Sequence, residues 1–314
     1  MWRRQILILL LISSIFAGCI FSSDDLIDIT APEINVLEPH ERDELAAGEF
    51  ITFDATFMDD LELGSYSIDV HDNLDGHGHG RIAQPKDDPG LERWIFKKNY
   101  EIPEGYIMYA AQHDDDILIA ENAMAGPYHF IVQAVDQAGN ATNYQDGSTI
   151  EFEVLITNDS QPVVTITNLV EGELEIQEGV RFQVQGDISD PTTGTYSGFH
   201  WLEVLLGEDQ EESHEHVHAS SGHDESELYM HGRTNQDEHE ALIDADYEGS
   251  ELDVFVKEGV IQLDQVFESI DFTLSQQQLD ELTSEGVDHL LLSIKVKYEQ
   301  GNLSISRTAV HIHM

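Results

Sequence analysis

The chain has almost no cysteine and little positive charge. Cys19 is the only cysteine among 314 residues, so no disulfide within one chain can form, and packing or bound ions must supply stability. Lysine and arginine total 14 against 62 aspartates and glutamates, a formal net charge of -48. Such a surface repels nucleic acid and anionic lipid headgroups and attracts cations. We therefore expect no nucleic-acid partner, and either adaptation to high salt or collection of cations.

The N-terminus carries a short apolar run. Two arginines precede about ten apolar residues, Ile6 to Ile15, too few to cross a bilayer but typical of a signal peptide. Ala17-Gly18-Cys19 then resembles the bacterial lipobox. We expect a lipoprotein signal peptide over residues 1–18, a membrane anchor through a lipid on Cys19, and a tether over residues 19–31; an uncleaved anchor helix is the alternative. The acidic residues after Cys19 resemble a surface-export signal of some Gram-negative lipoproteins. The expected location is the outer membrane, on the cell surface or the periplasmic face.

Apolar and polar residues alternate through much of the remaining chain. Ile51, Phe53, Ala55 and Phe57 are separated by polar side chains, as in a half-buried strand. The alternation recurs at residues 66–70, 130–134 and 152–156, and turns rich in glycine or proline separate the runs. This pattern predicts an all-β fold built from antiparallel β-sandwiches. Ser275 and the eleven residues that follow it, QQQLDELTSEG, predict a short helix capped by the serine.

The second half of the chain echoes the first. PEINVLEP from Pro32 aligns with PVVTITNL from Pro162, and GPYHFIVQAVDQAGN aligns with GVDHLLLSIKVKYEQGN, which places His129 opposite His289. We expect two tandem domains, residues 32–158 and 159–314. Residues 207–250 are rich in Glu, Asp, His, Ser and Gly, and they predict a long acidic, His-rich insertion in the second domain.

The first half resembles a known family. It contains, in order, GEFITFDATFMDD, IDVHDNLDGHGHG, a tryptophan and GPYHFIVQAVDQAGN. This order resembles the uncharacterised domain of unknown function 4625, found mainly in outer-membrane lipoproteins of one Gram-negative phylum. The resemblance covers residues 32–157 and implies an immunoglobulin-like sandwich there, with a diverged copy in the second half. It implies no biochemical activity. The family pattern falls on His71, His77, His79 and His129, with Asp59 and Asp60 in the preceding turn.

The stretch HDNLDGHGHG, residues 71–80, concentrates histidine beside glycine and acids. Neutral imidazole is a common ligand of zinc and copper. His71 ends one predicted strand and His129 begins another, so two sheet histidines and two loop histidines could meet if these strands are neighbours. We predict a zinc or copper(II) site of His71, His77, His79 and His129, with Asp72, Asp75 or His113 as substitutes. The alternative is a solvated loop beside an ordinary strand histidine.

The second half repeats a histidine cluster in the corresponding place. A second metal site there would use His214, His216, His218 and His289, with Leu205 standing where the first half has His71. His311 and His313 alternate on the final predicted strand and either add to this site or are simply exposed. Calcium is the less favoured ion, because no Asp-x-Asp-x-Asp-Gly loop is present, although Asp114–Asp116 and the acidic loop offer oxygen ligands.

Catalytic motifs do not accompany these histidines. HEHVH, residues 214–218, fits H-E-x-x-H, but its polar flanks lack the apolar stripe of a helix. GxSxG, P-loop and cysteine-nucleophile motifs are absent. We therefore expect a non-catalytic lipoprotein, not an enzyme, that captures, buffers or delivers zinc or copper, with an outer-membrane metal transporter as candidate partner. The alternative is a surface structural or adhesion module, binding protein or glycan, whose histidines are structural or unliganded.

Overall fold

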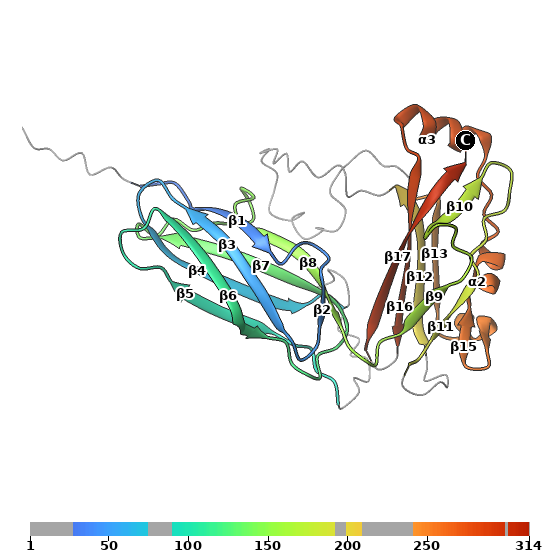
Figure 1. The fold of residues 1–314 in the computed structure, drawn as a ribbon, viewed down its shortest axis with the longest axis horizontal. Coiled ribbons are helices and arrows are strands. Elements are labelled where there is room, and N and C mark those ends of the chain that lie inside the picture. Colours follow the sequence, from blue (N-terminus) through green and yellow to red (C-terminus); the bar gives the residue numbers. More distant parts are fainter. Residues whose placement is uncertain (1–27, 75–89, 192–198, 209–240, 299–300, 314) are drawn as a thin grey trace, which may run out of the picture.

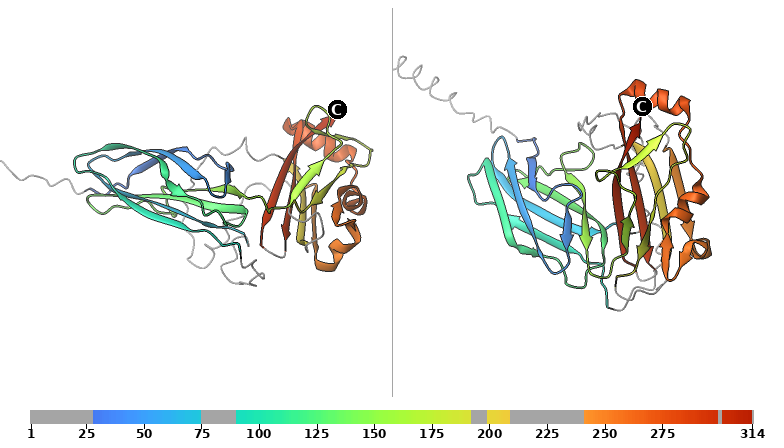
Figure 2. Two further views of the ribbon diagram at one scale, coloured as in Figure 1. Left: turned by 60° about the horizontal axis from the view of Figure 1, so that its bottom comes forward. Right: turned by 45° about the vertical axis from the view of Figure 1, so that its right-hand side comes forward.

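The computed structural model describes residues 28–74, 90–191, 199–208, 241–298 and 301–313, and all structural statements below concern these residues (Figure 1). They form two groups of β-sheets, one on each side of residues 158–162, and the two groups diverge from a shared contact (Figure 2). The predicted all-β fold is confirmed. Among these residues, no helix has the length and apolar character needed to cross a bilayer.

The first sandwich packs a five-stranded sheet, in the order β2-β8-β7-β4-β5, against a three-stranded sheet, β1-β3-β6. Phe53 of the smaller sheet stacks on Phe130 of the larger one, and both side chains are fully buried. The strands are β1 Glu33–Glu38, β2 Glu44–Ala46, β3 Phe50–Met58, β4 Leu63–Asp72, β5 Phe96–Glu101, β6 Met108–Leu118, β7 Gly126–Asp136 and β8 Ile150–Thr157. Alternation predicted this burial: Ile51, Phe53, Ala55 and Phe57 of β3 face the core, and the polar residues between them do not.

The second sandwich repeats this plan with added helices. Its sheets have the orders β10-β17-β16-β12-β13 and β14-β15-β11-β9. The strands are β9 Val163–Ile166, β10 Leu174–Gln177, β11 Gly186–Ser189, β12 Phe199–Glu208, β13 Ile243–Glu248, β14 Val256–Lys257, β15 Val260–Gln262, β16 His289–Tyr298 and β17 Leu303–His313. The helices are the 3₁₀ helix η3 Gly249–Phe255, α2 Leu263–Ile270 and α3 Gln276–Glu285. As predicted, Ser275 caps α3, and Gly286 ends it with a positive φ of 81°.

The two larger sheets match position by position. In each, an early short strand pairs in parallel with the last long strand, β2 with β8 and β10 with β17. Strands β7 and β16 therefore occupy equivalent positions in their sheets, as the predicted alignment of His129 with His289 requires. The predicted counterpart of His71 is wrong, because His71 lies opposite His129 whereas Leu205 lies opposite Ser293. A shift of four residues keeps every side chain on the same face of a strand, so apolar alternation could not detect the error.

The predicted insertion over residues 207–250 is also too long. Strand β12 continues to Glu208, and Ile243–Glu248 forms β13, which pairs with β12. In β13 the side chains of Ile243, Ala245 and Tyr247 are more buried than the acids between them. The high acid content hid this alternation, because the acidic side chains lie on the exposed face of an edge strand.

The two sandwiches are bonded to each other beside residues 158–162. Asn302 is 1% exposed; its Oδ1 accepts hydrogen bonds from Ala125 N (2.9 Å) and Asn158 Nδ2 (3.1 Å), and its Nδ2 donates to Ser160 O (3.1 Å). Lys297 Nζ donates to Leu74 O at 3.0 Å. An apolar cluster of Leu74, Met124 and Leu303 covers the same joint. Buried hydrogen bonds and apolar contact together fix one sandwich against the other at this end.

Candidate metal centres

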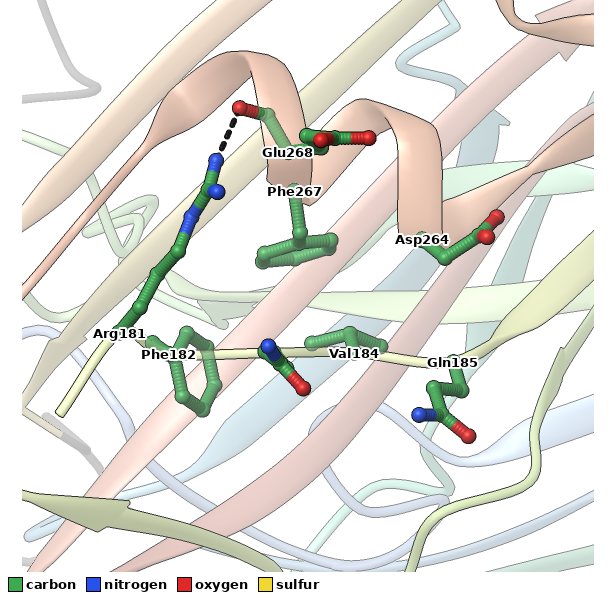
Figure 3. Close-up of a pocket in the computed structure, with 8 residues that line it drawn as sticks. Arg181, Phe182, Val184, Gln185, Asp264, Phe267 and Glu268 are labelled. Carbon is green, nitrogen blue, oxygen red and sulfur yellow. Dashed lines mark hydrogen bonds between the residues drawn. The ribbon is translucent and has the colours of Figure 1, made fainter.

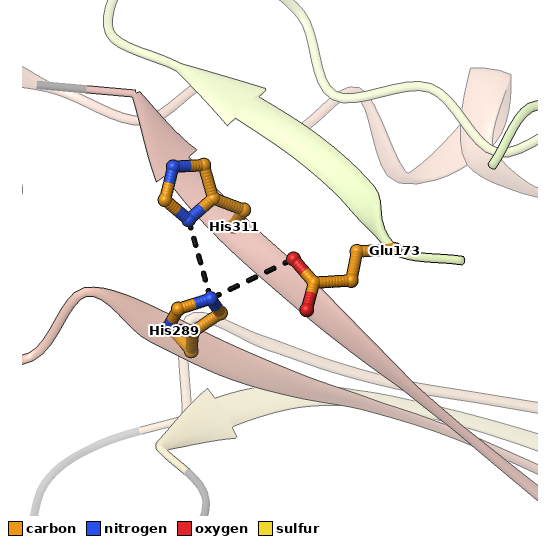
Figure 4. A group of neighbouring side chains, drawn as sticks. All are labelled: Glu173, His289 and His311. Atoms are coloured by element: carbon orange, nitrogen blue, oxygen red, sulfur yellow. Dashed lines mark hydrogen bonds and ion pairs between the residues drawn. The ribbon is translucent and has the colours of Figure 1, made fainter. Parts of the chain in front are cut away.

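Two histidines and a glutamate meet at one end of the larger sheet of the second sandwich (Figure 4). Glu173 immediately precedes β10, His289 begins β16, and His311 lies near the end of β17. His289 and His311 are direct partners across the antiparallel pair β16–β17, and β10 runs beside β17. The sheet therefore brings together residues that are far apart in the sequence.

The distances in this centre suit one metal ion. His289 Nε2 lies 3.2 Å from His311 Nδ1 and 3.6 Å from Glu173 Oε2. A tetrahedral ion with bonds of about 2.1 Å needs ligand atoms about 3.4 Å apart. The two measured distances fall on either side of that value. The side chains of His289 and Glu173 are 43% and 40% exposed, so an ion can reach them from solvent.

Asp288 orients His289 from the other side of the ring. His289 Nδ1 donates a hydrogen bond to Asp288 Oδ1 at 2.9 Å. This bond raises the pKa of His289 above its ordinary 6.5 and lowers the pKa of Asp288. With the proton held on Nδ1, the neutral ring directs the lone pair of Nε2 toward Glu173 and His311. Carboxylates commonly orient metal-binding histidines in this way.

A second histidine–carboxylate pair lies on β10 and β17. His313 Nε2 lies 3.2 Å from Glu175 Oε1, and the rings of His311 and His313 are 5.2 Å apart and nearly perpendicular. Of the two terminal histidines that the sequence left open, His311 joins the centre directly. The two glutamates were missed, although their i, i+2 spacing in ELEI is the same as that of the histidines in HIH.

The first sandwich places His71 directly opposite His129 on β4 and β7, the neighbouring strands that the sequence predicted. Their ring centroids are 5.4 Å apart. His71 Nδ1 lies 3.0 Å from Asp69 Oδ1, and His129 Nδ1 lies 2.8 Å from Glu151 Oε1. Burial acts to raise the pKa of Asp69, but hydrogen bonds from Lys97 and His71 outweigh it and hold that pKa below 3.8. Each histidine thus has a carboxylate at Nδ1, as His289 has.

Comparison with known proteins identifies the first half. Residues 19–151 match the family model described as Domain of unknown function (DUF4625). The match covers less than half of the chain, and we use the name DUF4625 domain below for the first sandwich, most of which it covers. The resemblance found in the sequence is confirmed, and His71 and His129 both lie within the matched residues.

Other comparisons are more distant, and no curated protein matches the chain. A chimeric titin Z1Z2-Z1Z2 tandem is 11% identical over 90% of this chain and 100% of its own, with a TM-score of 0.30. Fibronectin(III)-like modules of Clostridium thermocellum CbhA are 11% identical over 89% and 93%, with a TM-score of 0.22. A protein of unknown function from Porphyromonas gingivalis W83 is 9% identical over 90% and 99%, with a TM-score of 0.28. At these scores the similarities add nothing to the fold described above.

Several residues predicted to bind metal or, in the case of Cys19, to carry a lipid lie outside the described residues. They are Cys19, Asp75, His77, His79, His214, His216 and His218. His113 is described, and it does not join His71 and His129 of the DUF4625 domain. It belongs to β6 in the opposite sheet, where its Nε2 lies 2.6 Å from the Tyr66 hydroxyl and its ring packs on Tyr100. Asp72 accepts a hydrogen bond from Arg93 at 2.7 Å.

Oxygen-rich groups also occur in the DUF4625 domain. Asp28, Asp59 and Asp60 lie close together near the start of β4, at the opposite end of that strand from His71, and Glu38, His40 and Asp43 form an exposed group. Asp116, one of the residues considered for calcium, instead accepts hydrogen bonds from Lys98 and Tyr100. Calcium binding stays a prediction.

The second sandwich also has an open cavity of about 230 Å³ between α2 and residues 181–185 (Figure 3). Phe182, Val184 and Phe267 are its buried apolar lining, and Asp264 and Glu268 lie on the exposed side of α2. Arg181 is held at one side by the carbonyl of Glu268 and by Asp271. The lining contains no histidine, so this cavity offers no counterpart to the two histidine centres.

Proposed function

We propose that this protein is a non-catalytic metal-binding lipoprotein of the cell envelope, which captures, buffers or delivers zinc or copper. The observation that carries the proposal is the centre of Glu173, His289 and His311. Its ligand atoms are spaced for one ion, and Asp288 already orients one ring. Two imidazole nitrogens with one carboxylate oxygen suit zinc and copper(II), whereas calcium takes oxygen ligands.

The charge of the molecule supports the same proposal. A net charge of -48 raises the concentration of cations near the surface, and the histidines then select transition metals from the attracted ions. The pair of His71 and His129, each with a carboxylate at Nδ1, supports a second centre in the DUF4625 domain. Both centres contain exposed or half-buried ligands, as an ion must enter and leave if it is to be delivered.

The location is part of the proposal. Cys19 follows the apolar N-terminal run and would carry the lipid that anchors the protein in the outer membrane. An outer-membrane metal transporter is the proposed partner. Mass spectrometry of the N-terminal peptide from the native membrane tests the anchor: we expect a lipid-modified Cys19, and an unmodified cysteine within an intact leader would contradict it.

Metal binding is tested on the full chain by elemental mass spectrometry after dialysis against trace mixed metals. The key variant replaces His289 and His311 with alanine. His200→Ala is the matched control, because His200 is an exposed histidine at the opposite end of the same sheet. We expect the double variant to lose about one zinc or copper ion per chain and the control to lose none. The absence of bound metal from the wild-type protein would refute the proposal.

Two further measurements define the ligands. A variant with His71→Ala and His129→Ala should lose a different ion from the one lost when His289 and His311 are replaced.

Because histidine titrates near pH ~6.5, protons should compete with the metal in mild acid. Affinity that survives unchanged below pH ~5 would argue against histidine ligation.

The alternative function is a structural or adhesion module. The joint around Asn302 favours it, because buried hydrogen bonds between the sandwiches suit a spacer that holds a fixed shape. In that case metal removal, or substitution of the histidines, should change the unfolding temperature at most and leave cellular zinc and copper unchanged. The same alanine variants, expressed in the native cell and compared for metal content, distinguish the two functions.

A further inference from the structure

We infer that the second sandwich holds two metal ions side by side, the second bound by Glu175 and His313. This inference rests on the proposed function, since it assigns a further ion to the same end of the same sheet. The first ion belongs to Glu173, His289 and His311. The second site uses two residues that the first does not need.

The strand geometry generates the second site from the first. Side chains at i and i+2 of a strand point to the same face and lie about 7 Å apart. Strands β10 and β17 are parallel, so a step of two residues moves in the same direction on both. Glu173 and His311 become Glu175 and His313 after that step. The acid–histidine pair is therefore repeated along β10 and β17, and we call these residues together with Asp288 and His289 the strip.

The contact within the second pair has the spacing of metal ligands. His313 Nε2 and Glu175 Oε1 are 3.2 Å apart, close to the ~3.4 Å edge of a tetrahedral site. Their side chains are 46% and 45% exposed, which leaves room for water or an incoming protein ligand to complete the coordination. Figure 4 shows that the second ring nitrogen of His311 lies on the side of the ring away from His289.

Charge also favours two ions. The strip contains three carboxylates, Asp288, Glu173 and Glu175, beside three imidazoles, and it belongs to a molecule of large negative charge. One divalent ion leaves one of these three negative charges uncompensated; a second ion brings the group to a net charge of about +1, which the net charge of -48 on the whole molecule readily offsets. Two adjacent exposed sites also give a captured ion a place to move to before it leaves the protein.

Copper(II) is the probe, because two paramagnetic ions about 7 Å apart couple magnetically and isolated ions do not. The full chain is titrated with copper(II) and followed by electron paramagnetic resonance. We expect an uncoupled signal at low occupancy and a dipole-broadened signal with a half-field transition near saturation. A variant with Glu175→Gln and His313→Gln should lose the coupled signal and about one copper ion, while retaining the first.

His200→Gln is the matched control and should behave as the wild type. The single variant His313→Gln repeats the test with a smaller change, and thermal unfolding without metal shows that each variant is folded. A coupled signal that persists in the double variant, or a wild-type chain that binds only uncoupled copper, overturns the second site while the proposed function stands. No copper bound in any form overturns both.

Discussion

At the scale of single residues, Asp288 determines which nitrogen His289 presents to an ion. Replacing Asp288 by asparagine removes the charged acceptor that holds the proton on Nδ1. We expect zinc affinity at this centre to fall by about 10–100-fold, the usual cost of losing such an orienting carboxylate. Competition with a chelating dye measures the affinity. Asp280→Asn, an exposed acid on α3, is the control and should leave it unchanged.

Single residues also show what the sequence could and could not predict. Alignment of the two halves placed His129 and His289 on equivalent strands. Alternation placed His71 at the end of one strand and His129 at the start of another, and the immunoglobulin-like topology that the family resemblance implies makes these strands neighbours. Glu173 was out of reach, because it meets His289 only through the parallel pairing of β10 with β17. Strand pairing between distant segments depends on tertiary packing, which a local residue pattern does not encode.

At the scale of secondary structure, the sequence predicted the N-terminal cap of α3, and the contribution of this cap to the free energy of unfolding can be measured. Ser275 Oγ accepts from Gln278 N, and Gln278 Oε1 accepts from Ser275 N. Ser275→Ala should lower the free energy of unfolding by about 1 kcal/mol, because it leaves a helix donor without its partner. Ser284→Ala in the same helix should have little effect or stabilise slightly, since alanine favours helix. Urea unfolding compares the two variants.

The edge between β5 and β6 is closed by a polar and aromatic cluster whose stability depends on pH. Hydrogen bonds from Lys98 and Tyr100 hold the pKa of Asp116 below 3.8. Because the folded state favours the charged carboxylate, its stabilisation is present above pH ~3.8 and is lost as pH falls through the lowered pKa. Asp116→Asn should therefore be less stable than wild type at pH 6, and the difference should shrink in acid.

Chemical unfolding at pH 6, 4 and 3 tests this dependence. Asp115→Asn is the control, because Asp115 is an exposed neighbour on the same strand. A constant difference between Asp116→Asn and wild type across the pH range would show that the Asp116 hydrogen bonds do not control the acid sensitivity.

At the scale of the whole molecule, the hydrogen bonds of Asn302 hold the two sandwiches together. Asn302→Ala would leave the buried Ala125 N–H without its acceptor and remove the side-chain hydrogen bonds to residues 158 and 160. We expect the free energy of unfolding to fall by about 1–3 kcal/mol, the range for unsatisfied buried polar groups. In calorimetry the wild type should unfold with the sandwiches coupled, and the variant should show two separated transitions.

Asn99→Ala, an exposed asparagine on β5, is the control for this joint and should change stability by less than about 0.5 kcal/mol. Equal effects of the two substitutions would contradict the joint. The fold class followed from apolar alternation. The joint did not, because Asn302 in EQGN has the composition of an ordinary turn, and only the packed molecule shows that it is buried.

Strand β17 lies between β16 and β10, carries His311 and His313, and begins beside the joint residue Asn302. Strand β10 joins the sheet only by pairing with β17, where Leu174 lies opposite Val310. The larger sheet of the second sandwich therefore cannot form completely until the ribosome has made β17. A nascent or proteolytically clipped molecule without β17 would lack an inner strand of its sheet, the apolar contact of Leu303 at the joint and two of the three imidazoles, those of His311 and His313. Metal loading would then report that β17 has been made and has joined the sheet.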